Sequence, residues 1–300
     1  MKSLLLLVLF VFTATCATIS ESQIKQELEF TQSLHCELGE LKKSFGVSES
    51  FNTYEKEYFD RVNSTKPSLL NEADFYDRLN QSKIIVMADN HVSFGSQTNT
   101  INIIQRQSKS SKKLILVIEW IDRSFQAVVN QYLLGQLSLD ELKSKVLFDE
   151  LWAFSWESYS RILKAAKDQK VPIYLVENLK NTKDLTSRDD EITKLVNKLL
   201  QKNAESQVMV VYGTYHILGK NHLFQRFLKL DKKTTAIVSQ AEQAYWTIVK
   251  QTKDSEKLRQ FKLAERVMYL HDSKPLHQLE DERYYYLNLL GWDEEEYFCD

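Results

Sequence analysis

The sequence predicts an α/β protein with a mostly parallel central sheet flanked by helices, and with helical additions at both ends. Between residues 83 and 240, short apolar runs alternate with segments of helical periodicity, which is typical of successive βα units. Three of these runs end in residues that can carry chemistry: Asp89 and His91, Glu119, and Gly213 followed by His216. Parallel sheets bind ligands just beyond the carboxyl ends of their strands, so we expect these side chains at one edge of the sheet.

The predicted elements follow from hydrophobic periodicity. Apolar runs rich in β-branched residues predict five buried strands, at 83–88, 114–119, 171–176, 207–212 and 235–239. Apolar residues spaced three and four apart predict helices at 20–45, 71–80, 96–108, 125–133, 157–170, 189–202 and 223–228. Segment 47–70 is predicted to be irregular, and the chain after Gln240 is predicted to be mostly helical with an acidic, solvated tail at 293–300.

The amino terminus has the pattern of an export signal. Lys2 precedes an apolar run at 4–12 that is too short to span a bilayer, and small residues at 13–17 resemble a cleavage region. Cleavage after Ala17 and lipidation of Cys16 are both compatible with this pattern. We therefore expect an exported protein, secreted or held in the cell envelope, whose contact with a membrane is limited to a lipid on Cys16.

These signals divide the chain into four parts: a signal peptide at 1–17, a helical amino-terminal extension at 18–82, the α/β core at 83–240 and a helical carboxy-terminal extension at 241–300. Cys36 and Cys299 remain after the signal, and either a disulfide or two separate thiols fits an oxidising compartment.

Composition excludes several functions. The net charge is −2, with both signs mixed along the chain, so no nucleic-acid partner is expected. With seven glycines, the sequence has neither a phosphate-binding loop nor a dinucleotide fingerprint. It also lacks a Gly-x-Ser-x-Gly elbow and a Cys-x-x-Cys pair. A small molecule is the expected partner, and a homodimer is left open.

Acidic and imidazole side chains at the strand ends suit two kinds of chemistry. Asp89, His91, Glu119 and His216 could hold a divalent metal ion that activates water, or a His–carboxylate pair could act as a general base without metal. Glu177, after the 171–176 strand, is a further but weaker candidate. The remaining histidines are predicted to be surface groups: His35, His222, His271 and His277.

Haem is a separate hypothesis, because tyrosine can ligate ferric haem. Tyr215, beside His216, and the run Tyr284–Tyr285–Tyr286 are the candidate ligands. The alternative interpretation is that these tyrosines are half-buried packing residues.

The order of motifs resembles the ChaN-like haem-binding branch of the Tiki/erythromycin-esterase superfamily. The similar stretches are ADNH at 88–91, LVIEWIDRSFQAVVNQYLLGQLSLDEL at 116–142, WESYSRILKAAKDQKVPIYLVEN at 156–178, RDDEI at 188–192 and GTYHILG at 213–219. Carried over motif by motif, the resemblance implies a catalytic set of Asp89, His91, Glu119, Arg188 and His216.

The sequence departs from the superfamily pattern at one motif. Ala88 and Asp89 replace Gly and Glu, which shortens the carboxylate by roughly 1.5 Å. The resemblance therefore predicts the fold more strongly than it predicts hydrolytic activity. The resemblance, together with the export signal, implies a haem- or iron-binding protein of iron uptake. The alternatives are a metal-assisted esterase or peptidase and a family member with a structural or partner-binding role.

Overall fold

The computed structural model describes residues 19–180, 184–253 and 259–292. The predictions for the export signal, for Cys16 and for the partner cysteine Cys299 lie outside these residues, as does the acidic tail. Cys36 is exposed and has no disulfide partner among the described residues.

The predicted α/β class is confirmed. Within the described residues, eight strands form one sheet in the order β1-β7-β8-β6-β2-β5-β3-β4. The pairings of β7 with β1 and β8 are antiparallel, and the other neighbouring pairs are parallel. The strands are β1 (Ser68–Leu69), β2 (Ile84–Asp89), β3 (Leu114–Ile118), β4 (Ile173–Leu175), β5 (Gln207–Gly213), β6 (Thr234–Val238), β7 (Gln260–Ala264) and β8 (Val267–Leu270).

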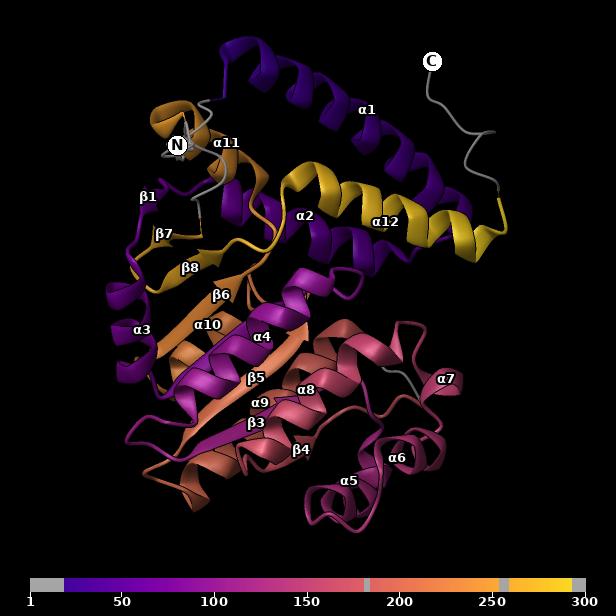
Figure 1. Ribbon diagram of the computed structural model, residues 1–300, viewed down its shortest axis with the longest axis vertical. Helices are drawn as coiled ribbons and strands as arrows, with labels where there is room; N and C mark the ends of the chain where they lie inside the picture. The colour runs from indigo at the N-terminus through magenta and orange to yellow at the C-terminus, as the bar shows by residue number, and fades with distance from the viewer. Residues whose placement is uncertain (1–18, 181–183, 254–258, 293–300) are drawn as a thin grey trace, which may run out of the picture.

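Helices cover both faces of the sheet and the carboxyl ends of its strands (Figure 1). They are α1 (Glu21–Phe45), α2 (Glu49–Asn63), α3 (Glu72–Gln81), α4 (Phe94–Gln107), α5 (Gln126–Leu133), α6 (Leu139–Lys145), α7 (Phe148–Leu151), α8 (Trp156–Asp168), α9 (Leu185–Lys202), α10 (Leu223–Leu230), α11 (Glu242–Thr252) and α12 (Pro275–Leu290), with short 3₁₀ turns η1 (Arg123–Phe125) and η2 (Thr214–His216).

The core strands are hydrophobic on both sides because each side packs against helices. In β2, Ile84 and Val86 belong to the apolar cluster shared with α9, α10 and α11, whereas Ile85 and Met87 belong to the cluster shared with α4, α5 and α8. This double burial explains why continuous apolar runs identified the strands. All five predicted strands are present, with ends that differ by no more than two residues.

Helices from the two ends of the chain form a cap over the carboxyl ends of the central strands (Figure 1). The cap consists of α1, α2 and α12. Leu38 and Leu41 of α1 pack with Leu279 and Leu287 of α12 in a hydrophobic cluster separate from the two sheet faces. The predicted helical character of both end segments is confirmed.

The prediction of an irregular segment at 47–70 is wrong, because most of it forms α2. The Ser48 side chain caps this helix by accepting a hydrogen bond from the Phe51 N–H. Tyr54, Tyr58 and Val62 are buried at spacings of four residues, the period of one helix face. Because this apolar face is narrow and the rest of the segment is polar, hydrophobic periodicity did not predict the helix.

The carboxy-terminal segment, predicted to be mostly helical, also contains two strands, β7 and β8. In β7, Phe261 and Leu263 are buried while their neighbours are partly exposed. Apolar and polar residues alternate over only five positions here, between charged segments, and this pattern is too short to predict a strand.

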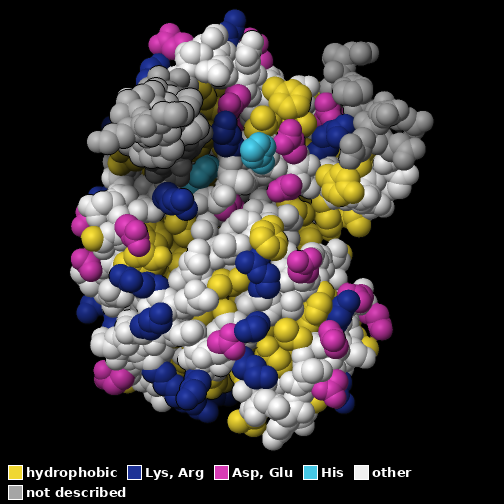
Figure 2. Space-filling model, viewed as in Figure 1, with side chains coloured by type: hydrophobic (Ala, Val, Ile, Leu, Met, Phe, Trp, Pro, Cys, Tyr) yellow, Lys and Arg dark blue, Asp and Glu magenta, His cyan; other side chains and the backbone are white. Residues whose placement is uncertain are grey.

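The surface in Figure 2 carries lysine and arginine side chains together with aspartate and glutamate over the same face. Among the described residues, no helix has both the length and the apolar character needed to cross a membrane.

Candidate functional site

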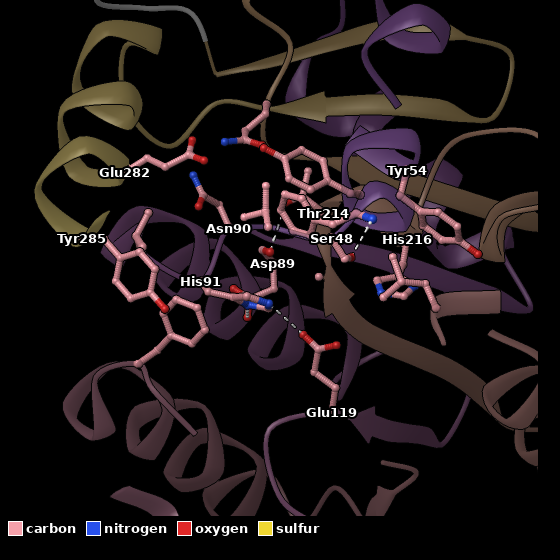
Figure 3. Close-up of a pocket in the computed structure, with 18 of the residues that line it drawn as sticks. Ser48, Tyr54, Asp89, Asn90, His91, Glu119, Thr214, His216, Glu282 and Tyr285 are labelled. Atoms are coloured by element: carbon pink, nitrogen blue, oxygen red, sulfur yellow. Dashed lines mark hydrogen bonds and ion pairs between the residues drawn. The ribbon is translucent and has the colours of Figure 1, made fainter. Parts of the chain in front are cut away.

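A cavity of about 400 Å³ lies between the carboxyl ends of the strands and the cap. Its floor contains residues that follow β2, β3 and β5, and α2 and α12 form much of its wall (Figure 3). The predicted site residues Asp89, His91, Glu119, Arg188 and His216 all line it, and Tyr215 lies in its wall. β2, β5 and β3 lie side by side in the sheet and run in the same direction. Their carboxyl ends therefore bring the acids and imidazoles to one edge.

The first cluster is centred on His91. Its Nδ1 lies 3.0 Å from Oδ2 of Asp89, which also accepts a 2.7 Å hydrogen bond from the Tyr159 hydroxyl. The other oxygen of Asp89 accepts a 2.8 Å bond from Gln97. The shorter carboxylate of Asp89 therefore still reaches the imidazole. Burial alone would lower the pKa of His91, but Glu119 and Asp89 raise it above its ordinary value.

Glu119 approaches the same imidazole from β3. Its Oε1 lies 3.2 Å from Nε2 of His91, the ion pair drawn as a dashed line in Figure 3. Among the described residues, no donor is aligned to form a hydrogen bond with this oxygen. Burial raises the pKa of Glu119 to about 7, although His91 and Arg188 oppose this shift. A carboxyl that is partly protonated near neutral pH can exchange protons with a ligand held beside it.

Gly213 permits this close arrangement. A Cβ at this position would lie 3.1 Å from Nε2 of His91 and 3.5 Å from Oε1 of Glu119. In the register of β2 and β5, Gly213 is opposite Asp89. A side chain here would push the first cluster apart.

Arg188 connects Glu119 to a second acid. Its Nε donates a 2.9 Å hydrogen bond to Glu177, and its terminal nitrogen lies 3.6 Å from Glu119. Glu177 also accepts a hydrogen bond from the buried Tyr212 hydroxyl. Glu177, a weaker candidate from sequence, is thus a partner of the site's arginine.

The second imidazole, His216, pairs with a different carboxylate from those around His91. Its Nδ1 lies 2.6 Å from Oδ1 of Asp189, at the start of α9. Burial lowers the pKa of His216 well below its ordinary value and raises that of Asp189 to about 7. Above neutral pH the imidazole is therefore uncharged and donates its Nδ1 proton to the carboxylate.

The predicted four-residue metal set is only partly brought together. Ligand atoms of Asp89, His91 and Glu119 lie within 4.8 Å of one another, and His216 is not part of this group. Tyr215 packs edge-on against Phe51, and burial raises its pKa well above 10. A phenolate ligand at this position would be costly.

Several site residues were not identified from the sequence. Tyr159 comes from α8 and Tyr54 from α2, whose helical nature was not predicted. Asp189 stands next to Arg188 in the RDDEI motif, so the motif itself contained the signal. The prediction that His222 is a surface group is wrong: it is 2% exposed and stacks on Tyr54.

Residues 75–181 match the sequence model of a family described as haem-binding uptake, Tiki superfamily, ChaN. This match confirms the predicted resemblance to the ChaN-like family. It contains Asp89, His91, Glu119 and Glu177, whereas Arg188 and His216 lie beyond it. No curated protein sequence matches the chain.

Three solved structures are similar to this chain at low identity. A structure described as cofacial haem binding to ChaN of Campylobacter jejuni is 14% identical, covers 57% of this chain and 86% of its own, and has a TM-score of 0.41. The type III effector HopBA1 is 9% identical, with 70% and 97% covered and a TM-score of 0.49. The C-terminal region of Pasteurella multocida toxin, described with a thiol-protease like catalytic triad, is 10% identical, with 72% and 30% covered and a TM-score of 0.42.

Proposed function

We propose that this ChaN-like protein binds haem in the cavity beneath the cap. The observation that carries the proposal is the lining of the cavity, which combines flat apolar surfaces with imidazoles that can ligate iron. Eight aromatic side chains contribute to it: Phe45, Phe51, Tyr54, Trp152, Phe154, Tyr215, Tyr285 and Tyr286. The match of residues 75–181 to the haem-binding family model supports the same ligand.

His216 is the residue best suited to hold the iron. A metal-ligating imidazole is neutral and donates its other ring proton to a carboxylate or carbonyl. The 2.6 Å contact with Asp189 and the lowered pKa of His216 meet both conditions. We therefore assign the ligand role to His216 rather than to Tyr215, and haem would be a cargo rather than a reactive group.

An absorbance titration tests this proposal. Protein lacking residues 1–17 should give a saturable Soret shift with haemin, and His216→Ala should weaken binding at least tenfold. His277→Ala, which changes an exposed histidine on α12, is the matched control and should bind like the native protein. Absence of a saturable shift in the native protein would rule out haem binding.

We further propose that haem is bound outside the cytoplasm, in iron uptake. The short apolar segment at 4–12 and the small residues after it support export. Cell fractionation should place the full chain in the envelope or medium, and a chain starting at residue 18 inside the cell. Loss of membrane association in Cys16→Ala would indicate a lipid anchor.

The second candidate is a metal-assisted hydrolase, which the Asp89–His91–Glu119 group specifically favours. One imidazole and two carboxylates suit a divalent first-row ion, and the unpartnered Oε1 of Glu119 is an available donor atom. Such an ion would lower the pKa of a water molecule. Glu119 would be one of the ion's carboxylate ligands, and the cation would hold this carboxyl in its charged form.

Elemental analysis separates the two candidates. The hydrolase predicts a stoichiometric divalent metal that is lost in His91→Ala but retained in His277→Ala. Native protein that binds haemin and contains no divalent metal would exclude the metal-assisted reaction. A protein with neither property would leave a structural or partner-binding role.

A further inference from the structure

Tyr54 and His222, which are not part of the cavity floor, lie behind the pair formed by His216 and Asp189. Oδ1 of Asp189 contacts Nδ1 of His216, and Oδ2 accepts a 3.3 Å hydrogen bond from the Tyr54 hydroxyl. Both oxygens of this buried carboxylate are thus engaged, one by the imidazole and one by α2. A carboxylate held at both oxygens has a fixed orientation.

Tyr54 is itself held by His222. Their rings stack with centroids 4.0 Å apart and planes inclined by 18°. Nε2 of His222 lies 3.2 Å from Oε2 of Glu57, which also accepts a 2.8 Å bond from the backbone N–H of Lys220. The imidazole of His222 is therefore tied to α2 and to the loop that precedes α10.

Gly219 completes this support. Its φ is +157°, and a Cβ at this position would lie 2.4 Å from the His222 ring. Only glycine leaves space for the imidazole, so the local backbone is built around the His222 side chain.

We infer that Tyr54 is a positioning residue for His216 and that His222 supports it. The chain of contacts from Glu57 through His222, Tyr54 and Asp189 keeps Nδ1 of His216 against the carboxylate. Nε2 is then the ring nitrogen left for a ligand in the cavity, since it has no hydrogen-bond partner among the described residues.

Tyr54 and His222 lie outside the 75–181 family segment, so this support is a contribution of the cap and the 213–223 loop. The part of the inference that concerns haem affinity rests on the proposed function. The part that concerns the orientation of His216 does not.

Nitrogen-15 NMR of labelled histidine at pH 8 tests the orientation directly. The His216 signal is assigned by its loss in His216→Gln. In the native protein we expect a single neutral tautomer with the proton on Nδ1. Tyr54→Phe, which removes only the hydroxyl, should introduce the tautomer with the proton on Nε2.

Tyr58→Phe is the matched control. Tyr58 is also buried, lies one turn later on α2, and donates its hydroxyl to the Gln240 carbonyl at 2.7 Å. This variant should leave the His216 tautomer native. A native tautomer in a folded Tyr54→Phe protein, or the same change in both variants, would overturn the inference.

The support by His222 has a separate test. His222→Phe keeps an aromatic face against Tyr54 and should retain the native tautomer, whereas His222→Ala should reproduce the effect of Tyr54→Phe. If His222→Ala folds and keeps the native tautomer, His222 has no positioning role.

Haemin titration provides the functional readout. Loss of the carboxylate that holds a metal-ligating imidazole typically lowers affinity 10- to 100-fold. Tyr54 acts on His216 through that carboxylate, Asp189, so Tyr54→Phe should have a smaller effect and weaken haemin binding by about three- to tenfold relative to Tyr58→Phe. Equal haemin affinities in the two variants would refute this part of the inference. Failure of the native protein to bind haemin would refute the proposed function alone, because the NMR comparison needs no ligand.

Discussion

Glu119 carries a carboxyl group whose pKa, about 7, results chiefly from burial. In an unfolded chain the same group has a pKa near 4.5. The folded protein therefore binds this proton more tightly than the unfolded chain does. Stability from this group is greatest below pH 4.5 and decreases as the pH rises to 7, by about 3 kcal/mol in total.

Glu119→Gln should remove this pH dependence. Relative to the native protein, the variant should be more stable at pH 8, by up to about 3 kcal/mol, and of similar stability at pH 4.5. Urea unfolding at both pH values measures the difference. Glu150→Gln, an exposed site on α7, is the control and should show no such trend. A stability difference that is the same at both pH values would contradict the assignment.

Gly213→Ala tests the close packing of the first cluster. The added Cβ would lie 3.1 Å from Nε2 of His91, so this imidazole must move by a few tenths of an ångström. We expect about tenfold weaker binding of haemin or Co²⁺, whichever the native protein binds, with the fold retained.

The control for this substitution is Gly39→Ala. Gly39 lies in the interior of α1, and a Cβ there meets no atom within 4 Å. This variant should keep native affinity and gain about 0.5–1 kcal/mol of stability, because alanine is the better helix former. Native affinity in Gly213→Ala would show that His91 and Glu119 are not confined by β5.

At the scale of elements, the sequence predicted what depends on local periodicity. The core strands were identified because burial on both faces makes them continuously apolar. Asp89, Glu119 and His216 could be placed in one site because parallel strands end at a common edge. Tyr54 and Tyr159 could not be placed, because they reach Asp189 and Asp89 from helices whose position is set by tertiary packing.

Within the cap, Lys42 of α1 forms ion pairs with both of the other helices. Its ammonium lies 2.6 Å from Glu55 of α2 and 2.8 Å from Glu282 of α12, and its side chain is 12% exposed. The two carboxylates raise the pKa of Lys42 despite its burial. One lysine thus links the three helices of the cap.

Lys42→Met should destabilise the protein by about 3 kcal/mol at pH 7, because two poorly solvated carboxylates lose their counter-ion. Lys43→Met changes the next residue, whose side chain is 77% exposed, and should alter stability by less than about 1 kcal/mol. Equal effects of the two substitutions on urea unfolding would contradict a structural role for the buried lysine.

At the scale of the whole molecule, the two ends of the chain build one structure. The amino-terminal segment supplies β1, which pairs with β7, and β8 pairs with β6 at the edge of the core. α1 packs against α12 through the cap's own hydrophobic cluster. The sequence predicted terminal extensions, but their joint packing depends on contacts between residues more than 190 positions apart, which periodicity does not reveal.

A chain that ends at residue 252 tests whether the carboxy-terminal segment is separable. Truncation removes β7, β8 and α12, leaves the edge of β6 unpaired, and exposes Leu34, Leu38 and Leu41 of α1. An unpaired strand edge beside exposed leucines favours aggregation, so we expect insoluble protein or unfolding without cooperativity. A chain ending at residue 292 keeps all of these contacts and should unfold cooperatively. Soluble, cooperatively unfolding protein from the shorter chain would show instead that residues 253–300 are a true extension of an independent core.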